Sequence, residues 1–194
     1  MLSPNIIRKS PIRVNMSDDP AKERVESLAR LTELIKNIEG SKVTLIGDTM
    51  LDRFHHGFAN NLNSTSPVPV LKVTRTEESA GASAHIAIGL TSFGMDVCFH
   101  TCVGDDSDGD SLISSLKNSG VGVKDTIVIE GRKTLTKIRF FGSRESLLDR
   151  EQILLQADRG PNEILDPSVS EKLTSNAQSS MSDSSALIIS DYNK

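Results

Sequence analysis

The sequence predicts an α/β fold built on a mostly parallel β-sheet. Short apolar, β-branched segments such as Lys42–Gly47 and Met95–Val103 alternate along the chain with longer segments of helical periodicity. Two of the helical segments open with capping residues, as at Asp166-Pro167. This alternation is typical of parallel strands joined by helical crossovers.

The first predicted element is a helix from Asp19 to Glu39. Asp19 suits the N-cap, Pro20 suits the first helical position, and Gly40 provides the stop. Its apolar residues form one stripe at helical spacing: Val25, Leu28, Leu31, Ile35 and Ile38. A buried strand, Lys42–Gly47, follows directly.

The next predicted elements surround a polar stretch. Residues 53–66 are rich in Asn and Ser, which predicts a loop or an excursion from the core. Val68–Thr74 reads as an extended strand, and the prolines 67 and 69 restrict it to an edge or a lid. Ala80–Phe93 is small and apolar and is closed by Gly94, which predicts a tightly packed helix.

The second half of the chain continues the alternation. A buried strand over Met95–Val103 precedes a helix that Asp106 or Asp108 caps and that ends near Lys117. Strands are expected over 125–130, 134–141 and 152–157, with a charged hairpin tip over 142–151. A helix then follows Asp166 and faces the core with four residues: Val169, Leu173, Ala177 and Met181. Ala186–Ile189 is expected to be another buried strand.

Composition excludes several classes of protein. The 194 residues fit one domain, or one and part of another. A net charge of −4, no dense Lys/Arg cluster and 4% aromatic residues argue against a nucleic-acid partner. No apolar run approaches ~18 residues, so no membrane-spanning helix is expected. Two cysteines indicate a reducing compartment, the cytoplasm.

Residues 1–17 precede the first predicted element and differ from the rest of the chain in charge. They carry Arg8, Lys9 and Arg13 and no acidic residue. We expect a disordered tail, with an organellar targeting signal as the alternative.

Four familiar site motifs are absent or incomplete. Neither G-x-x-x-x-G-K-[ST] nor G-x-G-x-x-G occurs. The acidic run 104–110 lacks the ligands of a calcium loop at its first and last positions, which favours acids at a helix N-terminus. Cys98, His100 and Cys102 share a strand face, but the outer pair is ~13 Å apart in a regular strand, too far for one zinc ion.

The segment Gly47–Phe54 is the strongest candidate site. Asp48 and Asp52 follow a buried strand, and ligands bind at the carboxyl ends of parallel strands. A carboxylate there can accept hydrogen bonds from sugar hydroxyls, or it can cap local N–H groups.

Two further segments are candidates. Residues 81–85, Gly-Ala-Ser-Ala-His, combine small residues with His85, which permits either close backbone approach to a ligand or close helix packing. Lys137 and Arg139 are two residues apart and share one strand face. This face is either part of a binding site or a surface exposed to solvent.

Together these stretches resemble the ribokinase-like (PfkB-type) carbohydrate kinases, closest to the heptose 7-phosphate kinase branch. The matching blocks span 42–194 in the family's order: VTLIGDTMLDRF, SPVPVLKV, GASAHIAIGLTSFG, VGDD, TKIRF and SDYNK. The resemblance implies a Rossmann-like domain of helices and parallel sheet over 18–194, with lid strands within 54–76 and 133–158. It implies a phosphorylated sugar as substrate, ATP with Mg²⁺ as cofactors, and a homodimer formed through the lid.

The resemblance also assigns residues. It implies that Asp52 binds sugar hydroxyls and that Gly81, Ala82 and His85 occupy the family's Gly-Gly-Ala-Ala-Asn block. Substrate-binding roles are likewise implied for four more residues: Lys137, Arg139, Asp191 and Lys194.

The chain departs from the family at four places. Ala82 replaces a glycine and His85 an asparagine, the segment between Arg139 and Arg150 is longer than the usual family form, and the catalytic Gly-Ala-Gly-Asp motif does not occur. No catalytic residue or metal ligand is therefore assigned. We expect the sugar-binding, N-terminal part of a kinase whose C-terminal part is missing, with ATP bound weakly. The alternative is a truncated, non-catalytic homologue that binds a sugar or dimerises.

Overall fold

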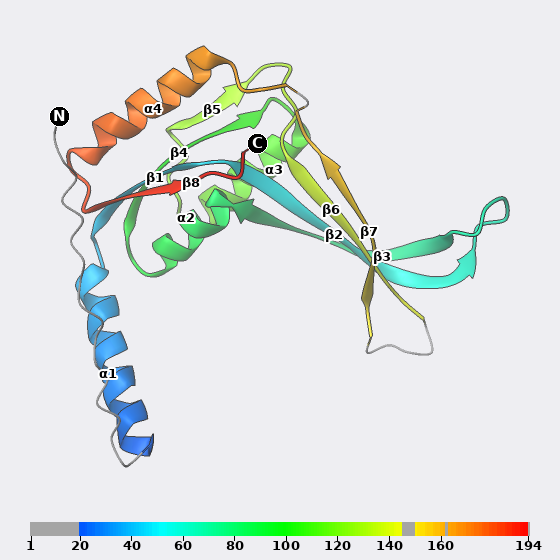
Figure 1. The fold of residues 1–194 in the computed structure, drawn as a ribbon, viewed down its shortest axis with the longest axis horizontal. Helices are drawn as coiled ribbons and strands as arrows, with labels where there is room; N and C mark the ends of the chain where they lie inside the picture. The colour runs from blue at the N-terminus through cyan, green and yellow to red at the C-terminus, as the bar shows by residue number, and fades with distance from the viewer. Residues whose placement is uncertain (1–19, 145–149, 162, 194) are drawn as a thin grey trace. The chain divides into compact units, whose positions relative to one another are not determined.

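The computed structural model describes residues 20–144, 150–161 and 163–193 (Figure 1). The chain divides into two units, Met1–Asn37 and Ile38–Lys194. Helix α1 (Pro20–Ile38) accounts for the described part of the first unit and confirms the predicted helix. Residues 1–17 and the predicted cap Asp19 lie outside the described residues. No helix in the described ranges has both the length and the apolar character to cross a membrane.

Sheet A is the parallel sheet that the alternating pattern predicted. Its strand order is β5-β4-β1-β8, and all pairs are parallel. The strands are β1 (Lys42–Gly47), β4 (Asp96–Gly104), β5 (Thr126–Ile129) and β8 (Ala186–Ser190). The connections between successive strands of sheet A contain the helices α2 (Ser83–Ser92), α3 (Ser107–Asn118) and α4 (Pro167–Met181).

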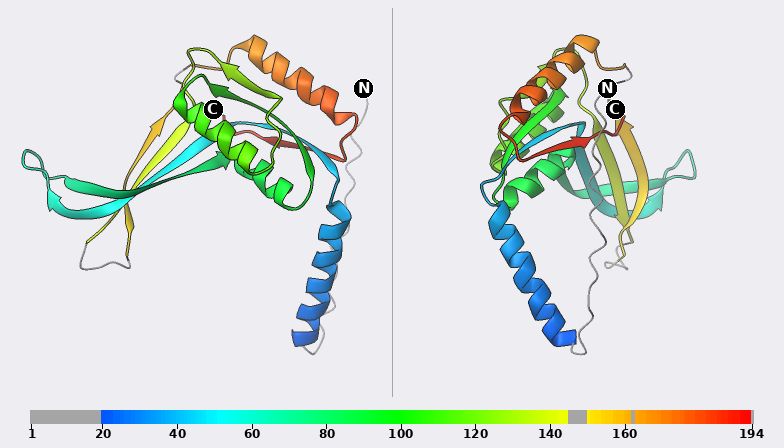
Figure 2. Two further views of the ribbon diagram at one scale, coloured as in Figure 1. Left: turned by 180° about the vertical axis from the view of Figure 1, so that it is seen from behind. Right: turned by 60° about the vertical axis from the view of Figure 1, so that its left-hand side comes forward.

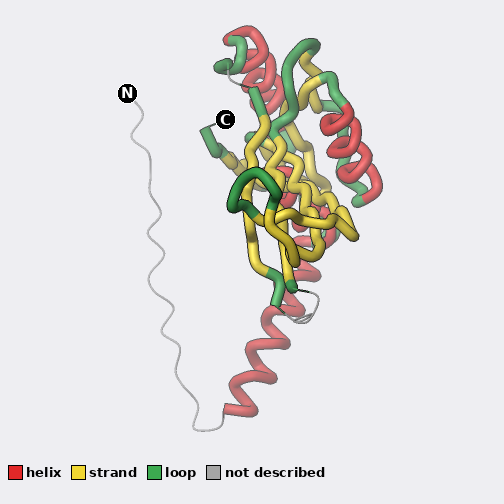
Figure 3. Tube along the Cα trace, turned by 90° about the vertical axis from the view of Figure 1, so that its right-hand side faces the viewer, coloured by secondary structure: helices red, strands yellow, loops and turns green. Residues whose placement is uncertain are grey.

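Alternation along the strands sends successive side chains of sheet A to opposite helical layers. Leu45 and Phe99 are buried in one cluster with Ala84 of α2 and Leu112 of α3. On the other face, His100 Nε2 lies 3.0 Å from Ser180 Oγ of α4. Sheet A therefore lies between α4 and the pair α2 and α3 (Figures 1 and 3).

Sheet B is a mixed sheet with the order β3-β2-β6-β7. It contains β2 (Thr49–Leu62), β3 (Pro69–Ala82), β6 (Thr136–Ser143) and β7 (Gln152–Arg159). β2 is antiparallel to β3 and parallel to β6, and β7 is antiparallel to β6. The β2–β3 ribbon extends well away from sheet A (Figure 2). The tip predicted over 142–151 includes residues 145–149, which lie outside the described ranges.

Of the two alternatives for residues 53–66, the loop is wrong and the excursion from the core holds, because β2 continues to Leu62 in the ribbon that leads away from sheet A (Figure 2). Its polar residues have low strand propensity, but β2 pairs with a strand on each side, and this ladder overrides propensity. The turn covers only the residues that follow, up to Pro67. Pro69 opens β3, which is an edge strand as the prolines predicted.

Three other expectations need correction. The helix predicted over Ala80–Phe93 begins at Ser83, because residues 80–82 are the end of β3. β8 is an edge strand rather than a buried one, with Leu187 39% and Ile189 69% exposed. Helix α4 buries Leu173 and Ala177, whereas Met181 at its last position is exposed.

The chain passes from sheet A to sheet B through the three residues Gly47, Asp48 and Thr49. A Cβ on Gly47 would lie 2.2 Å from the Ser190 carbonyl oxygen, so β8 can approach only a glycine here. The Asp48 N–H donates to the same carbonyl (3.1 Å), and the Ser83 N–H donates to the Asp48 carbonyl (3.0 Å). This passage therefore joins β1, β8 and the start of α2.

Ala82 has an unusual backbone at the junction of β3 and α2. Its φ of 53° and ψ of −130° lie in a region that glycine occupies freely and that a Cβ makes strained. Substituting Ala82→Gly should relieve this strain. Although glycine also gives the unfolded chain more freedom, we expect the free energy of unfolding to rise by about 1 kcal/mol in urea denaturation.

Ala84→Gly is the matched control, because Ala84 is buried inside α2. It should lower the free energy of unfolding by about 1 kcal/mol or more. Equal destabilisation by both glycines would show that Ala82 carries no strain.

Buried His100 makes stability dependent on pH. Burial is the main effect on its pKa, and it lowers the pKa below the ordinary value. The negative charge of Asp125 raises the pKa by less, and the positive charge of Lys124 lowers it further. The unfolded chain binds the proton at about pH 6.5, the folded chain only at lower pH, so acidification favours unfolding. We expect the free energy of unfolding to fall more steeply from about pH 6.5 to 5 in the wild type than in His100→Gln.

The exposed His85 provides the matched control for this experiment, since His85→Gln also removes one histidine but from the surface. Parallel profiles for the wild type and His100→Gln would contradict the role of His100.

Candidate functional site

Asp52 lies near the start of β2, where Gly81 of β3 makes room for its carboxylate. A Cβ on Gly81 would lie 2.3 Å from Asp52 Oδ2, so any other residue would displace the carboxylate. The Asp52 side chain is 18% exposed. Two of the predicted site residues, Asp52 and Gly81, are therefore in direct contact.

Arg139 of β6 holds the other carboxylate oxygen. Its Nη1 donates to Asp52 Oδ1 over 2.7 Å, and its side chain is only 23% exposed. The guanidinium carbon also lies 5.4 Å from the centre of the Phe54 ring. Arg139 is thus held in place by an ion pair and an aromatic ring.

Lys137 completes a polar face on sheet B. It is the register partner of Asp52 on β2 and of Asp158 on β7, so the three side chains emerge on one side of the sheet. Gln156, two residues before Asp158, donates to its carboxylate over 2.9 Å. We define the polar face as five residues: Asp52, Lys137, Arg139, Gln156 and Asp158.

Ala82 and His85 lie at the start of α2, beside the first residues of β2. Ala82 is the register partner of Thr49, and the Ser83 N–H and hydroxyl both donate to the Asp48 carbonyl. His85 is exposed in the first turn of α2. The backbone of this segment is thus held at Asp48, while the His85 imidazole points outward.

Asp191 lies in a different part of the molecule from the polar face. It lines a groove of about 480 Å³ with Asp48, between α4 and the carboxyl ends of β1 and β8. The Tyr192 N–H donates to Asp48 Oδ2 over 2.7 Å, which fixes the backbone next to Asp191. Lys194 is outside the described residues. The predicted residues thus form two groups, which Asp48 and Asp52 connect along the chain.

The first positions of α3 hold two aspartates with different roles. Asp106 is the N-cap and accepts from the Gly109 N–H (3.0 Å) and the Thr134 N–H (3.1 Å). Burial raises the pKa of Asp106, but hydrogen bonds from Thr134 and Gly109 outweigh it, and the pKa is lowered overall. This confirms the prediction that acids complement a helix N-terminus.

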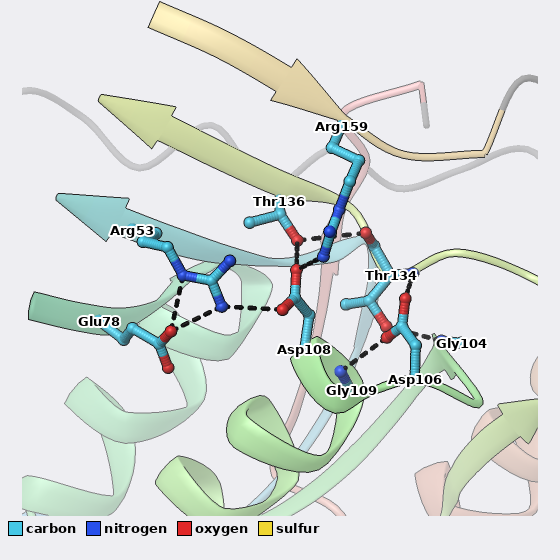
Figure 4. Close-up of polar contacts among 9 residues, drawn as sticks. All are labelled: Arg53, Glu78, Gly104, Asp106, Asp108, Gly109, Thr134, Thr136 and Arg159. Atoms are coloured by element: carbon cyan, nitrogen blue, oxygen red, sulfur yellow. Dashed lines mark hydrogen bonds and ion pairs between the residues drawn. The ribbon is translucent and has the colours of Figure 1, made fainter. Parts of the chain in front are cut away.

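Asp108, in contrast, is a buried ion-pair partner that sequence reasoning missed. It is 1% exposed and contacts Arg53 of β2, Thr136 of β6 and Arg159 of β7 (Figure 4). No sequence pattern joins these residues, because 28 to 55 positions separate each from Asp108. The one available signal is alternation, which places Arg53 on the opposite face of β2 from Asp52.

A small cavity lies beside the passage between the sheets. Its volume is about 30 Å³, and its lining includes Thr49, Cys102, Arg132 and Lys133. The Thr49 hydroxyl is buried without a hydrogen-bond partner among the described residues. The cavity has room for a water molecule, which could satisfy that hydroxyl. Burial raises the pKa of the Cys102 thiol, which disfavours the reactive thiolate.

No described residues form a group of three or more His, Cys, Asp or Glu side chains suited to a metal ion. Cys98 and Cys102 are free thiols on β4, and both are partly exposed rather than buried.

Comparison with known proteins places these features in a family. Residues 41–177 match the model of the pfkB family carbohydrate kinases. The chain is 36% identical over 154 residues to the "Bifunctional protein HldE" of Haemophilus ducreyi. That match covers 79% of this chain and 30% of the relative, so the chain spans about a third of that protein's length.

Solved structures share the fold at lower identity. A carbohydrate kinase from Agrobacterium tumefaciens superposes with a TM-score of 0.54 and 15% identity, covering 77% of this chain and 45% of that chain. A ribokinase from Cryptococcus neoformans var. grubii in complex with ADP gives 0.50 and 18%, covering 77% and 40%. These two likenesses show the ribokinase-like fold, and the family match goes further. The chain belongs to the pfkB family of carbohydrate kinases.

Proposed function

We propose that this chain is the sugar-binding part of a kinase that transfers the γ-phosphate of ATP to a hydroxyl of a phosphorylated sugar such as heptose 7-phosphate. The observation that carries the proposal is the fixed Asp52 carboxylate. Arg139 occupies Oδ1, while Gly81, which has no side chain, leaves room for Oδ2. A carboxylate held in this way is preorganised to accept hydrogen bonds from sugar hydroxyls.

The rest of the polar face suits the same substrate. Lys137 supplies a cation beside Asp52, while Gln156 and Asp158 supply further donors and acceptors. A phosphate group on the sugar would be attracted by Lys137 and Arg139. In this proposal sheet B is the lid over the sugar, and the chain acts in the cytoplasm.

The described residues do not fit the nucleotide. The groove of about 480 Å³ is lined by Asp48 and Asp191 and by no Lys or Arg, so it would repel a triphosphate. Arg132 and Lys133 line a cavity of about 30 Å³, which is too small for a nucleotide. They also line an open groove of about 800 Å³, but the acidic residues Glu130, Glu163 and Asp166 line the same groove and outnumber them. We therefore assign no residue of the described chain to ATP or Mg²⁺ and derive no transfer step through them.

A second candidate is a non-catalytic module that forms homodimers through the lid. The edge strands of sheet B expose apolar side chains to solvent: Val70 and Val73 on β3, and Ile153 and Leu155 on β7. Unpaired, apolar edge strands favour association. The strained Ala82 and the outward His85 in the predicted sugar-binding block also favour this candidate.

The sugar site is tested by Asp52→Asn. This substitution keeps the size of the side chain beside Gly81 but removes its charge. Because hydrogen bonds to a charged group contribute about 1.5–3 kcal/mol, we expect calorimetry to show a loss of heptose 7-phosphate affinity of at least about ten-fold. Asp96→Asn, an exposed change at the amino end of β4, should bind as the wild type does. Unchanged affinity in folded Asp52→Asn would rule out the role of Asp52.

The dimer is tested by charges on the lid edges. If the lid edges mediate dimerisation, Val73→Lys combined with Ile153→Lys should shift the chain to monomer in sedimentation velocity, because a buried lysine is strongly unfavourable at an apolar interface. Val128→Lys is the control, since Val128 is equally exposed (51%) but lies on the edge strand β5 of sheet A. A wild-type monomer at high concentration would exclude this dimer.

A further inference from the structure

The buried carboxylate of Asp108 gathers three strands of sheet B at one point. Arg53 Nη2 of β2 donates to Asp108 Oδ1 over 2.8 Å, and Thr136 Oγ1 of β6 donates to Oδ2 over 2.6 Å. Arg159 of β7 also contacts Oδ2 through Nη2. Asp108 itself belongs to the first turn of α3, which packs on sheet A. Figure 4 shows these side chains converging on Asp108 from the strands above it.

The cluster is closed on its outer side by a fourth strand. Glu78 of β3 accepts from Arg53 Nε over 2.7 Å, and Glu78 and Arg53 are register partners. Two guanidinium groups and two carboxylates thus balance in charge, which a buried polar network requires. Every strand of sheet B therefore contributes one side chain to the cluster.

The cluster lies directly behind the candidate sugar site. Arg53 follows Asp52 in β2, and adjacent strand residues point to opposite faces. The same relation holds on β6, where Thr136 faces the cluster and its neighbour Lys137 belongs to the polar face, and on β7 between Arg159 and Asp158. The strand segments that carry three of the five polar-face residues are thus fixed from behind by Asp108.

We propose that Asp108 is a positioning residue that anchors the base of the lid to α3 and thereby holds the polar face in its sugar-binding geometry. The proposal rests on the proposed function for its effect on sugar binding, and on geometry alone for its effect on the lid. Asp108 touches no part of the polar face and acts through the backbone on either side of its three partners.

The test compares Asp108→Asn with two variants on the same helix. Asp110→Asn removes an exposed acid from the same first turn, so it reproduces any loss of helix-terminal charge. Leu112→Ala truncates a fully buried core residue of α3, so it reproduces a loss of overall stability. In each variant, the hydrogen–deuterium exchange of the lid peptides 136–141 and 152–158 is compared with the exchange of the sheet A peptide 97–103.

We expect Asp108→Asn to raise exchange in the two lid peptides selectively and to weaken heptose 7-phosphate binding by roughly ten-fold or more, as misplaced binding groups do. Asp110→Asn should change neither quantity. Leu112→Ala should raise exchange in sheet A as well and leave the affinity of the folded fraction unchanged.

The outcomes separate the two proposals. If the wild type binds no heptose 7-phosphate but Asp108→Asn still loosens the lid, the sugar assignment fails and the anchor stands. If Asp108→Asn loosens lid and core alike, as Leu112→Ala does, the anchor is overturned. If Asp108→Asn does not fold, the same exchange and binding measurements are made on Arg159→Gln. The Arg159 side chain is 47% exposed, so its replacement leaves the core intact.

Discussion

The passage of the chain through Gly47, Asp48 and Thr49 is the constraint on which the rest of the structure depends. It moves the backbone from the parallel sheet into the lid within three residues, and β8 packs so closely that only glycine fits at the first of them. The carbonyl of Asp48 accepts from the start of α2, and its carboxylate accepts from the Tyr192 N–H. Asp48 thereby fixes the positions of the parallel sheet, the lid and the N-terminus of α2 relative to one another.

β2 connects this junction to the candidate site, because its two faces carry side chains with different roles. One face presents Asp52, which Arg139 and Gly81 hold in place. The other presents Arg53, which is tied to Asp108 and Glu78. Breaking a buried ion pair of this kind leaves a charge without its partner and typically costs about 3–5 kcal/mol. In our proposal Asp52 therefore binds the sugar from one face of β2, while ion pairs of Arg53 hold the opposite face of the same strand.

Much of sheet A and its helices could be predicted from the sequence, because short β-branched segments, capping aspartates and terminal glycines are local signals. Local signals did not predict a strand over residues 53–62, since their strand conformation comes from pairing with β3 and β6 rather than from their own propensity, and only the family resemblance placed lid strands there. Motif resemblance located Asp52 and Arg139, but their ion pair joins residues 87 positions apart. Asp108 was missed for the same reason, because its partners are set by tertiary packing.

The parallel pairing of β8 with β1 has a consequence for the order of folding. Val43 pairs with Ala186, so the central strand gains its second neighbour only from residues made more than a hundred positions later. Closing so long a loop has a large entropic cost, and such contacts form slowly. On the ribosome, the lid hairpin of β2 and β3 can form from near neighbours long before β1 is flanked on both sides. Nascent chains therefore carry one open edge of the central strand until Ala186–Ser190 have been made.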